Sequence, residues 1–122
     1  MIYDRAAIEF LNDAFGFEFI GFEQDWNLEF ADPNRLDDFI DFFNREELNS
    51  KTKQALMSLI IASYDDFLFE ESERDNYGIK IKALIHRDFP LYRKELEYWS
   101  LDGEDDIFKV TPFIRSCINE YS

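Results

Sequence analysis

The feature that most restricts the fold is a long apolar stretch in the middle of the chain, KTKQALMSLIIASYDDFLFEE (residues 51–71). Asn49 or Ser50 precedes it in the position of a helix N-cap. Apolar side chains recur at helical spacing along one face, and a second set widens that face: Ala55, Leu56, Leu59, Ile60 and Phe67, then Met57, Ile61, Tyr64 and Leu68. A helix that is apolar around so much of its circumference belongs at the centre of a fold. We therefore expect the other elements to pack around this segment.

Five further segments have the apolar spacing of helices: 4–15, 31–44, 79–88, 90–99 and 110–121. The segment 79–88 also fits a strand that turns helical, but a helix is the preferred interpretation. Residues typical of helix ends support these boundaries, namely Asp4 and Gly16 around the first segment, Asp32 with Pro33 in the second, Pro90 in the fourth, and Thr111 with Pro112 in the last.

The stretch FEFIGFEQDWNLEF (residues 17–30) has a different period. Phe17 and Phe19 alternate with a polar residue, and so do Trp26, Leu28 and Phe30, which is the spacing of strands. The pattern predicts two short extended pieces, or a loop that lays these aromatic side chains on a helical core.

The expected architecture is all-α: a single domain over residues 1–122, built as a bundle of five or six helices, with a short extended segment near residues 17–30 as an option. A chain of 122 residues is the size of one domain, and its 46% of hydrophobic residues exclude disorder as the explanation of its high charge. Residues 101–106 are expected to form a loop.

The net charge is the strongest indication of function. With 27 acidic and 13 basic residues, the formal charge is −14, which disfavours direct binding to nucleic acid because phosphates require basic surfaces. A basic protein is a suitable partner, because the field of the acidic surface attracts it before contact. The alternative is that the charge only keeps the protein soluble.

Catalytic and metal-binding patterns are incomplete. His86 is the only histidine and Cys117 the only cysteine, which excludes an intrachain disulfide, a four-cysteine zinc site and paired-histidine metal motifs. His86 is interpreted as a helix-end residue or a structural hydrogen-bonding group. DDFID (37–41) has the spacing of a magnesium–diphosphate motif, but the chain is too short for the cavity that such enzymes need. DGEDD (102–106) lacks the glycine and glutamate of a calcium loop. We predict no metal, no cofactor and no enzymatic activity.

The N-terminal sequence lacks the features of a secretory leader, and no apolar stretch approaches the length of a membrane span. The expected location is the cytoplasm, without membrane association. The sequence predicts no particular oligomeric state.

An acidic cluster marks the end of the central helix. We predict that it binds a partner through Asp65, Asp66, Glu70, Glu71, Glu73 and Asp75, all expected to face outward. Acidic groups at a helix C-terminus oppose the helix dipole and repel one another, at a cost of about 0.3–1 kcal/mol each. A cationic partner would relieve this repulsion, whereas the alternative is an ordinary solvated helix end. A second candidate patch contains Asp37, Asp38 and Asp41, and the candidate aromatic anchors are Tyr98 and Trp99.

Three pieces, LMSLIIASYDDFL, LEYWS and DDIFKVTPFIRS, together with the size, acidity and helical character, resemble immunity proteins of bacterial contact-dependent growth inhibition and related polymorphic toxin systems. The resemblance extends over about half of the chain. It implies a cytoplasmic protein that binds the C-terminal toxin domain of its cognate partner, often a nuclease, and blocks it stoichiometrically. A nuclease carries a basic surface, which agrees with the separate argument from charge.

Two alternatives to the immunity function remain open. One is an acidic mimic of nucleic acid, or a regulator, that binds another basic cellular protein. The other is a small helical hydrolase that depends on carboxylates, since two carboxylates able to act as acid and base can be chosen in many ways from so acidic a chain.

Overall fold

The computed structural model describes residues 3–18, 26–70, 76–100 and 108–121, and these ranges contain helices and no strands. The α-helices are α1 (Arg5–Phe15), α2 (Trp26–Glu29), α3 (Leu36–Arg45), α4 (Ser50–Glu70), α5 (Tyr77–Arg87), α6 (Phe89–Ser100) and α7 (Thr111–Tyr121), and a 3₁₀ turn, η1 (Pro33–Arg35), precedes α3. The predicted all-α fold is confirmed. The count is slightly above the five or six expected, because α2 was not predicted as a helix.

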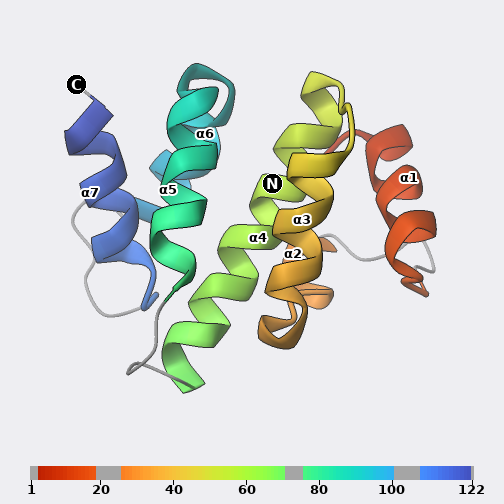
Figure 1. Ribbon diagram of the computed structural model, residues 1–122, viewed down its shortest axis with the longest axis horizontal. Helices are drawn as coiled ribbons and strands as arrows, with labels where there is room; N and C mark the ends of the chain where they lie inside the picture. The colour runs from red at the N-terminus through yellow and green to blue at the C-terminus, as the bar shows by residue number, and fades with distance from the viewer. Residues whose placement is uncertain (1–2, 19–25, 71–75, 101–107, 122) are drawn as a thin grey trace.

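Helix α4 is central, as its composition predicts. Every residue from 55 to 65 is buried, and α4 contacts α1, α2, η1, α3, α5 and α6. Figure 1 shows α4 crossing the middle of the molecule between α3 and α5, with α1 and α7 at opposite ends of the long axis. Helix α7 packs mainly on α5 and α6, and it reaches α4 through Phe113, whose ring meets the Tyr64 ring edge-on at 5.0 Å. The buried apolar side chains form one core.

Local sequence signals account for most helix boundaries. The Asp4 carboxylate accepts a hydrogen bond from the Ala7 amide at 3.1 Å, and α1 ends at Gly16, whose φ of 73° favours glycine. The side chain of Asn49 accepts from the Thr52 amide at 2.8 Å and so caps α4. These contacts confirm the predicted ends of α1 and the predicted start of α4.

The start of α7 differs from the prediction. The Thr111 hydroxyl does not cap the helix but donates a hydrogen bond to the Trp99 carbonyl at 2.8 Å. A carboxylate from α4 serves this end instead: Asp65 accepts from the Val110 amide at 2.9 Å. A cap supplied from 45 residues away leaves no local sequence signal.

The expectation of a second extended piece at 26–30 is wrong, because Trp26–Glu29 form a helical turn. Trp26 is buried and its indole Nε1 donates to Asn12 at 2.8 Å, while Phe17 stacks on Phe30 with centroids 4.6 Å apart. The aromatic side chains thus lie on a helical core, as the loop alternative proposed. Residues 19–25 lie outside the described ranges, so the first extended piece is described only at Phe17 and Glu18. No helix in the described ranges is long and apolar enough to cross a membrane.

Candidate partner-binding surface

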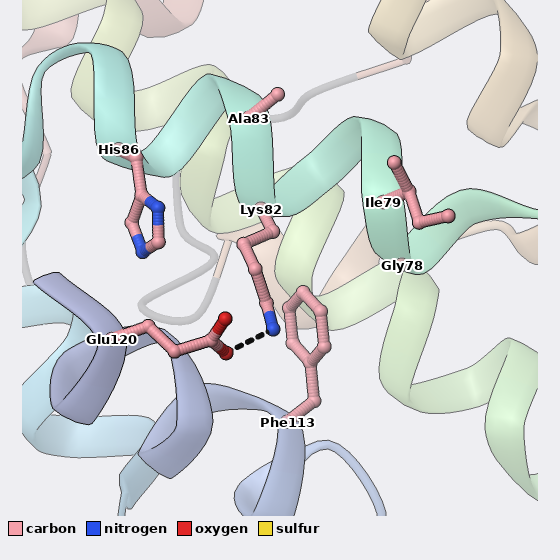
Figure 2. A pocket seen from close by; sticks show the side chains of 7 residues that line it. All are labelled: Gly78, Ile79, Lys82, Ala83, His86, Phe113 and Glu120. Carbon is pink, nitrogen blue, oxygen red and sulfur yellow. Dashed lines mark hydrogen bonds and ion pairs between the residues drawn. The ribbon is translucent and has the colours of Figure 1, made fainter.

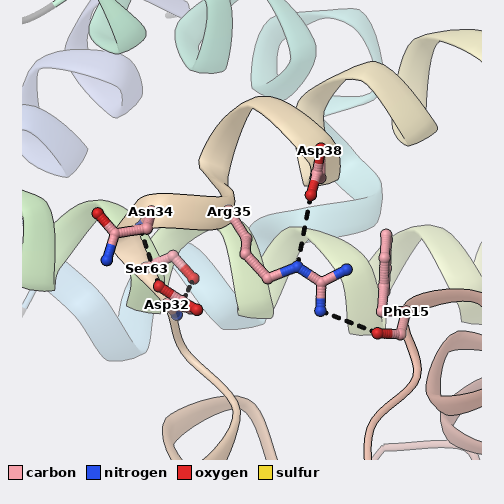
Figure 3. Close-up of polar contacts among 6 residues, drawn as sticks. All are labelled: Phe15, Asp32, Asn34, Arg35, Asp38 and Ser63. Atoms are coloured by element: carbon pink, nitrogen blue, oxygen red, sulfur yellow. Dashed lines mark hydrogen bonds and ion pairs between the residues drawn. The ribbon is translucent and has the colours of Figure 1, made fainter.

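The two acidic patches lie at the same end of the bundle. Helices α3 and α4 are joined by a short connection and run in opposite directions, so the start of α3 lies beside the C-terminal half of α4 (Figure 1). A hydrogen bond fixes this arrangement: the backbone amide of Asp32 donates to the Ser63 hydroxyl at 3.0 Å (Figure 3). Asp32 also caps η1 by accepting from the Asn34 amide at 2.9 Å.

Asp65 faces inward, which contradicts its predicted outward position. Only 7% of the residue is exposed, and its carboxylate accepts from the Val110 amide. Burial raises the pKa of Asp65, and the amides of Val110 and Lys109 partly offset this change. The reason for the inward position is that α4 is buried on all sides up to this residue. Asp65 is therefore a structural carboxylate that holds the start of α7.

Asp66 lies in a different environment. Its side chain is partly buried, and no ion pair within the described ranges neutralises it. Burial is the main cause of its raised pKa, and the negative charges of Asp65, Glu70 and Asp32 raise the pKa further. Asp66 is thus a carboxylate held among other carboxylates.

The last turn of α4 adds one charged and one apolar group to this region. Glu70 is exposed one turn after Asp66, and Phe69 is 57% exposed. The Lys109 ammonium lies 5.5 Å from the centroid of the Phe69 ring. The cation thus contacts the face of the ring.

The start of α3 is connected to this region through α5. Asp37 accepts a hydrogen bond from the Tyr77 hydroxyl at 3.3 Å, and the Tyr77 ring meets the Phe67 ring edge-on at 5.1 Å. Burial and the charge of Asp37 raise the pKa of Tyr77. Asp41 is exposed one turn further along α3. The two predicted patches therefore adjoin each other.

Asp38 is the acidic residue of α3 that has a basic partner. Arg35 Nε lies 3.4 Å from its carboxylate, and Arg35 also donates to the Phe15 carbonyl at 2.9 Å (Figure 3). The guanidinium lies 5.4–5.6 Å from the centroids of three phenylalanine rings. Arg35 is thus held by the fold, and it neutralises Asp38 rather than the carboxylates of α4.

We define the acidic end as the surface formed by Asp32, Asp37, Asp41, Asp66 and Glu70. Sequence analysis did not select Asp32, although its role as an N-cap was predicted. Three predicted binding residues, Glu71, Glu73 and Asp75, lie outside the described residues.

The predicted aromatic anchors differ in exposure. Trp99 is fully buried and its Nε1 donates to Glu95 at 2.7 Å, so its prediction as a surface anchor is wrong. The reason is that Trp99 lies on the inward face of α6. Tyr98 is exposed on its outer side and packs against Trp99 and Phe108, and its role as an anchor stays a prediction.

Glu95 is a buried carboxylate that sequence reasoning missed. It accepts hydrogen bonds from the Tyr3 hydroxyl at 2.6 Å and from Trp99. Burial raises the pKa of Glu95, and these two donors partly offset that change. Its position one turn before a tryptophan, beside Leu96, was the available signal.

The described residues contain no group of three or more histidine, cysteine or acidic side chains arranged to hold a metal ion. His86 contacts the Cys117 carbonyl through Nε2 at 3.0 Å. This contact confirms the interpretation of His86 as a structural hydrogen-bonding group.

Comparisons with protein-family models, with curated proteins and with solved structures find no match to this chain.

Proposed function

We propose that the protein is an immunity protein, which binds a basic toxin domain, such as a nuclease, through the acidic end and blocks it stoichiometrically. One observation carries the proposal: Asp66 is partly buried beside Asp32 and Glu70, and the negative charge of both neighbours raises its pKa. Like charges at this spacing are unfavourable in the free protein. Lysine or arginine side chains of a partner would remove the repulsion on binding.

The acidic end combines charge with an apolar contact. Phe69 is exposed beside Glu70 and replaces Trp99 as the candidate anchor. Long-range attraction would set the association rate, and burial of the aromatic side chain would slow dissociation. This division of roles is typical of interfaces between oppositely charged proteins.

The first test is rescue of growth. The gene directly upstream would be expressed with and without this protein, and we expect toxicity alone, rescue by co-expression, and co-purification of the two products. If the upstream product is harmless, the immunity proposal is wrong.

The second test locates the surface. The double variant Asp66→Asn/Glu70→Gln should bind the toxin domain at least about tenfold more weakly, since close charge pairs across interfaces contribute on the order of 1.5 kcal/mol or more. The matched control is Glu47→Gln/Glu97→Gln, which removes the same charge from two exposed sites outside the acidic end. Equal weakening by the two variants would mean that net charge, and not the acidic end, determines binding.

The hydrolase alternative predicts tight binding of magnesium or manganese. Isothermal titration of each ion into the protein tests it directly. Submicromolar binding together with hydrolytic activity would replace the immunity proposal.

A further inference from the structure

A groove of about 590 Å³ lies between α5 and α7, and none of the residues that line it belongs to the acidic end. Ile79, Lys82 and Ala83 line it from α5, and Phe113 and Glu120 line it from α7. Figure 2 shows the Lys82 side chain reaching towards Phe113 and Glu120, whereas the Ala83 side chain points away from α7. Ile79 is 84% exposed, more than any other large hydrophobic residue in the described ranges. The groove therefore presents apolar surface to solvent.

Side-chain contacts hold the two walls together. Lys82 forms an ion pair with Glu120 across the groove, and its ammonium lies 5.8 Å from the centroid of the Phe113 ring (Figure 2). Deeper in, His86 contacts the Cys117 carbonyl of α7. These links join the two walls of the groove, so contacts within the chain itself fix their spacing.

The charge of these two helices is opposite to that of the whole chain. Helix α5 carries Lys80 and Lys82 and no acidic residue, and α7 adds one arginine and one glutamate. The remaining cation of α5, Arg87, lines a different hollow against the end of α3 and the start of α4. The chain as a whole has a net charge of −14. An anionic ligand is thus repelled by most of the molecule and attracted to this face.

We propose that this groove binds an acidic amphipathic helix of a protein partner. Helices α5 and α7 run in the same direction side by side (Figure 1), and two adjacent helices form a groove into which a third helix can pack. Apolar side chains of the ligand would cover Ile79, Ala83 and Phe113. Its carboxylates would lie near Lys80, and one of them would compete with Glu120 for Lys82.

The test uses a designed helical peptide of about 18 residues, about five turns, with leucines along one face and glutamates beside them. Fluorescence anisotropy of the labelled peptide measures binding to the protein and its variants. We expect Ile79→Glu to weaken binding about tenfold or more, because it places a charge at the centre of the contact. Lys80→Glu should weaken it about threefold.

The matched control is Leu28→Glu, which adds the same charge at an exposed apolar residue of α2, on the other side of α4. This variant should bind the peptide like the unaltered protein. Thermal unfolding of each variant verifies that the fold is retained. Because Ile79 and Lys80 are both exposed, their replacement should leave the unfolding midpoint unchanged.

Several results would overturn the proposal. These are no binding at millimolar peptide, equal binding by Ile79→Glu and Leu28→Glu, or equal competition by polyglutamate, which lacks apolar side chains. Light scattering covers a further case: a dimer that Ile79→Glu dissociates would mean that a second copy of this chain occupies the groove. The experiment is independent of the growth test, so failure of the immunity proposal leaves its outcome unaffected.

Discussion

Asp65 and Asp66 follow each other on α4, but their side chains belong to two different regions. Asp65 is buried and bonded to the Val110 amide, whereas Asp66 faces the acidic end beside Asp32 and Glu70. Glu95 resembles Asp65, since it is buried and accepts two hydrogen bonds. These acidic residues are thus of two kinds. Asp65 and Glu95 are buried and stabilise the fold by accepting hydrogen bonds, whereas Asp66 belongs to the charged surface of the acidic end.

The largest expected effect concerns the fold. Glu95→Ala should lower the free energy of unfolding by about 3 kcal/mol, because it leaves the Tyr3 hydroxyl and the Trp99 Nε1 without their acceptor and opens a cavity. Urea unfolding measures the change. Glu97→Ala, two residues away and exposed, should change it by less than about 0.5 kcal/mol. Equal values would mean that the buried carboxylate has no structural role.

The second-largest expected effect concerns Asp65, the buried one of the two neighbouring aspartates. Asp65→Ala should destabilise the protein by about 2 kcal/mol, because the Val110 amide loses a charged acceptor. Asp65→Asn keeps an oxygen acceptor and should lose less. Hydrogen exchange of the amides at the start of α7 should accelerate in Asp65→Ala. If these amides stay protected, another group caps the helix.

Neutralising the acidic end should have a smaller effect of opposite sign. Asp66→Asn/Glu70→Gln should raise the free energy of unfolding by about 0.5 kcal/mol, because it removes like charges from a helix C-terminus. Urea unfolding measures the stability of this variant and of Glu47→Gln/Glu97→Gln. Because both variants lose the same charge, the difference between them is the local effect at the helix end. A loss of stability would show that these carboxylates support the fold as Asp65 does.

The smallest expected effect is the change of the protein's stability with pH, and the pKa shifts define its sign. The pKa values of Asp65, Asp66 and Glu95 are raised in the folded protein, mainly by burial, so the folded state binds protons more tightly than the unfolded state. Stability should therefore rise as the pH falls from 7 through these pKa values towards about 4, the ordinary carboxylate range.

Glu120 should act in the opposite direction, since its hydrogen bond with Lys82 lowers its pKa. Its contribution is present above the ordinary pKa and is lost as the pH falls through the lowered one. Urea midpoints measured between about pH 7 and about pH 3 should show a flatter rise for Asp66→Asn, and a smaller loss below about pH 4.5 for Glu120→Gln. Identical curves for both variants and the unaltered protein would contradict these assignments.

Most of the fold was predictable because its signals are local. The six long helices coincide with apolar spacing, and Asp4, Gly16 and Asn49 mark their ends as expected. Helix α2 was missed because alternation over a few residues does not distinguish a strand from a helical turn whose tryptophan faces the core.

The candidate site was predictable only in part. Charge density identified the end of α4 and the start of α3, but not that the antiparallel pairing of these helices brings them together. Asp65 and Trp99 were assigned to the surface because the groups that cover them lie outside their own helices: Val110 for Asp65, and Phe108 and Thr111 for Trp99. Packing partners of this kind leave no trace in local spacing.

The most direct test of the central claim is the rate at which this protein associates with the toxin domain encoded by the gene directly upstream. Stopped flow measures this rate at about 50 mM and about 300 mM salt, where screening differs strongly. We expect Asp66→Asn/Glu70→Gln to associate several-fold more slowly at low salt, about three- to tenfold, and to show a flatter salt dependence, while Glu47→Gln/Glu97→Gln changes little. An unchanged rate and salt dependence for Asp66→Asn/Glu70→Gln would contradict the account.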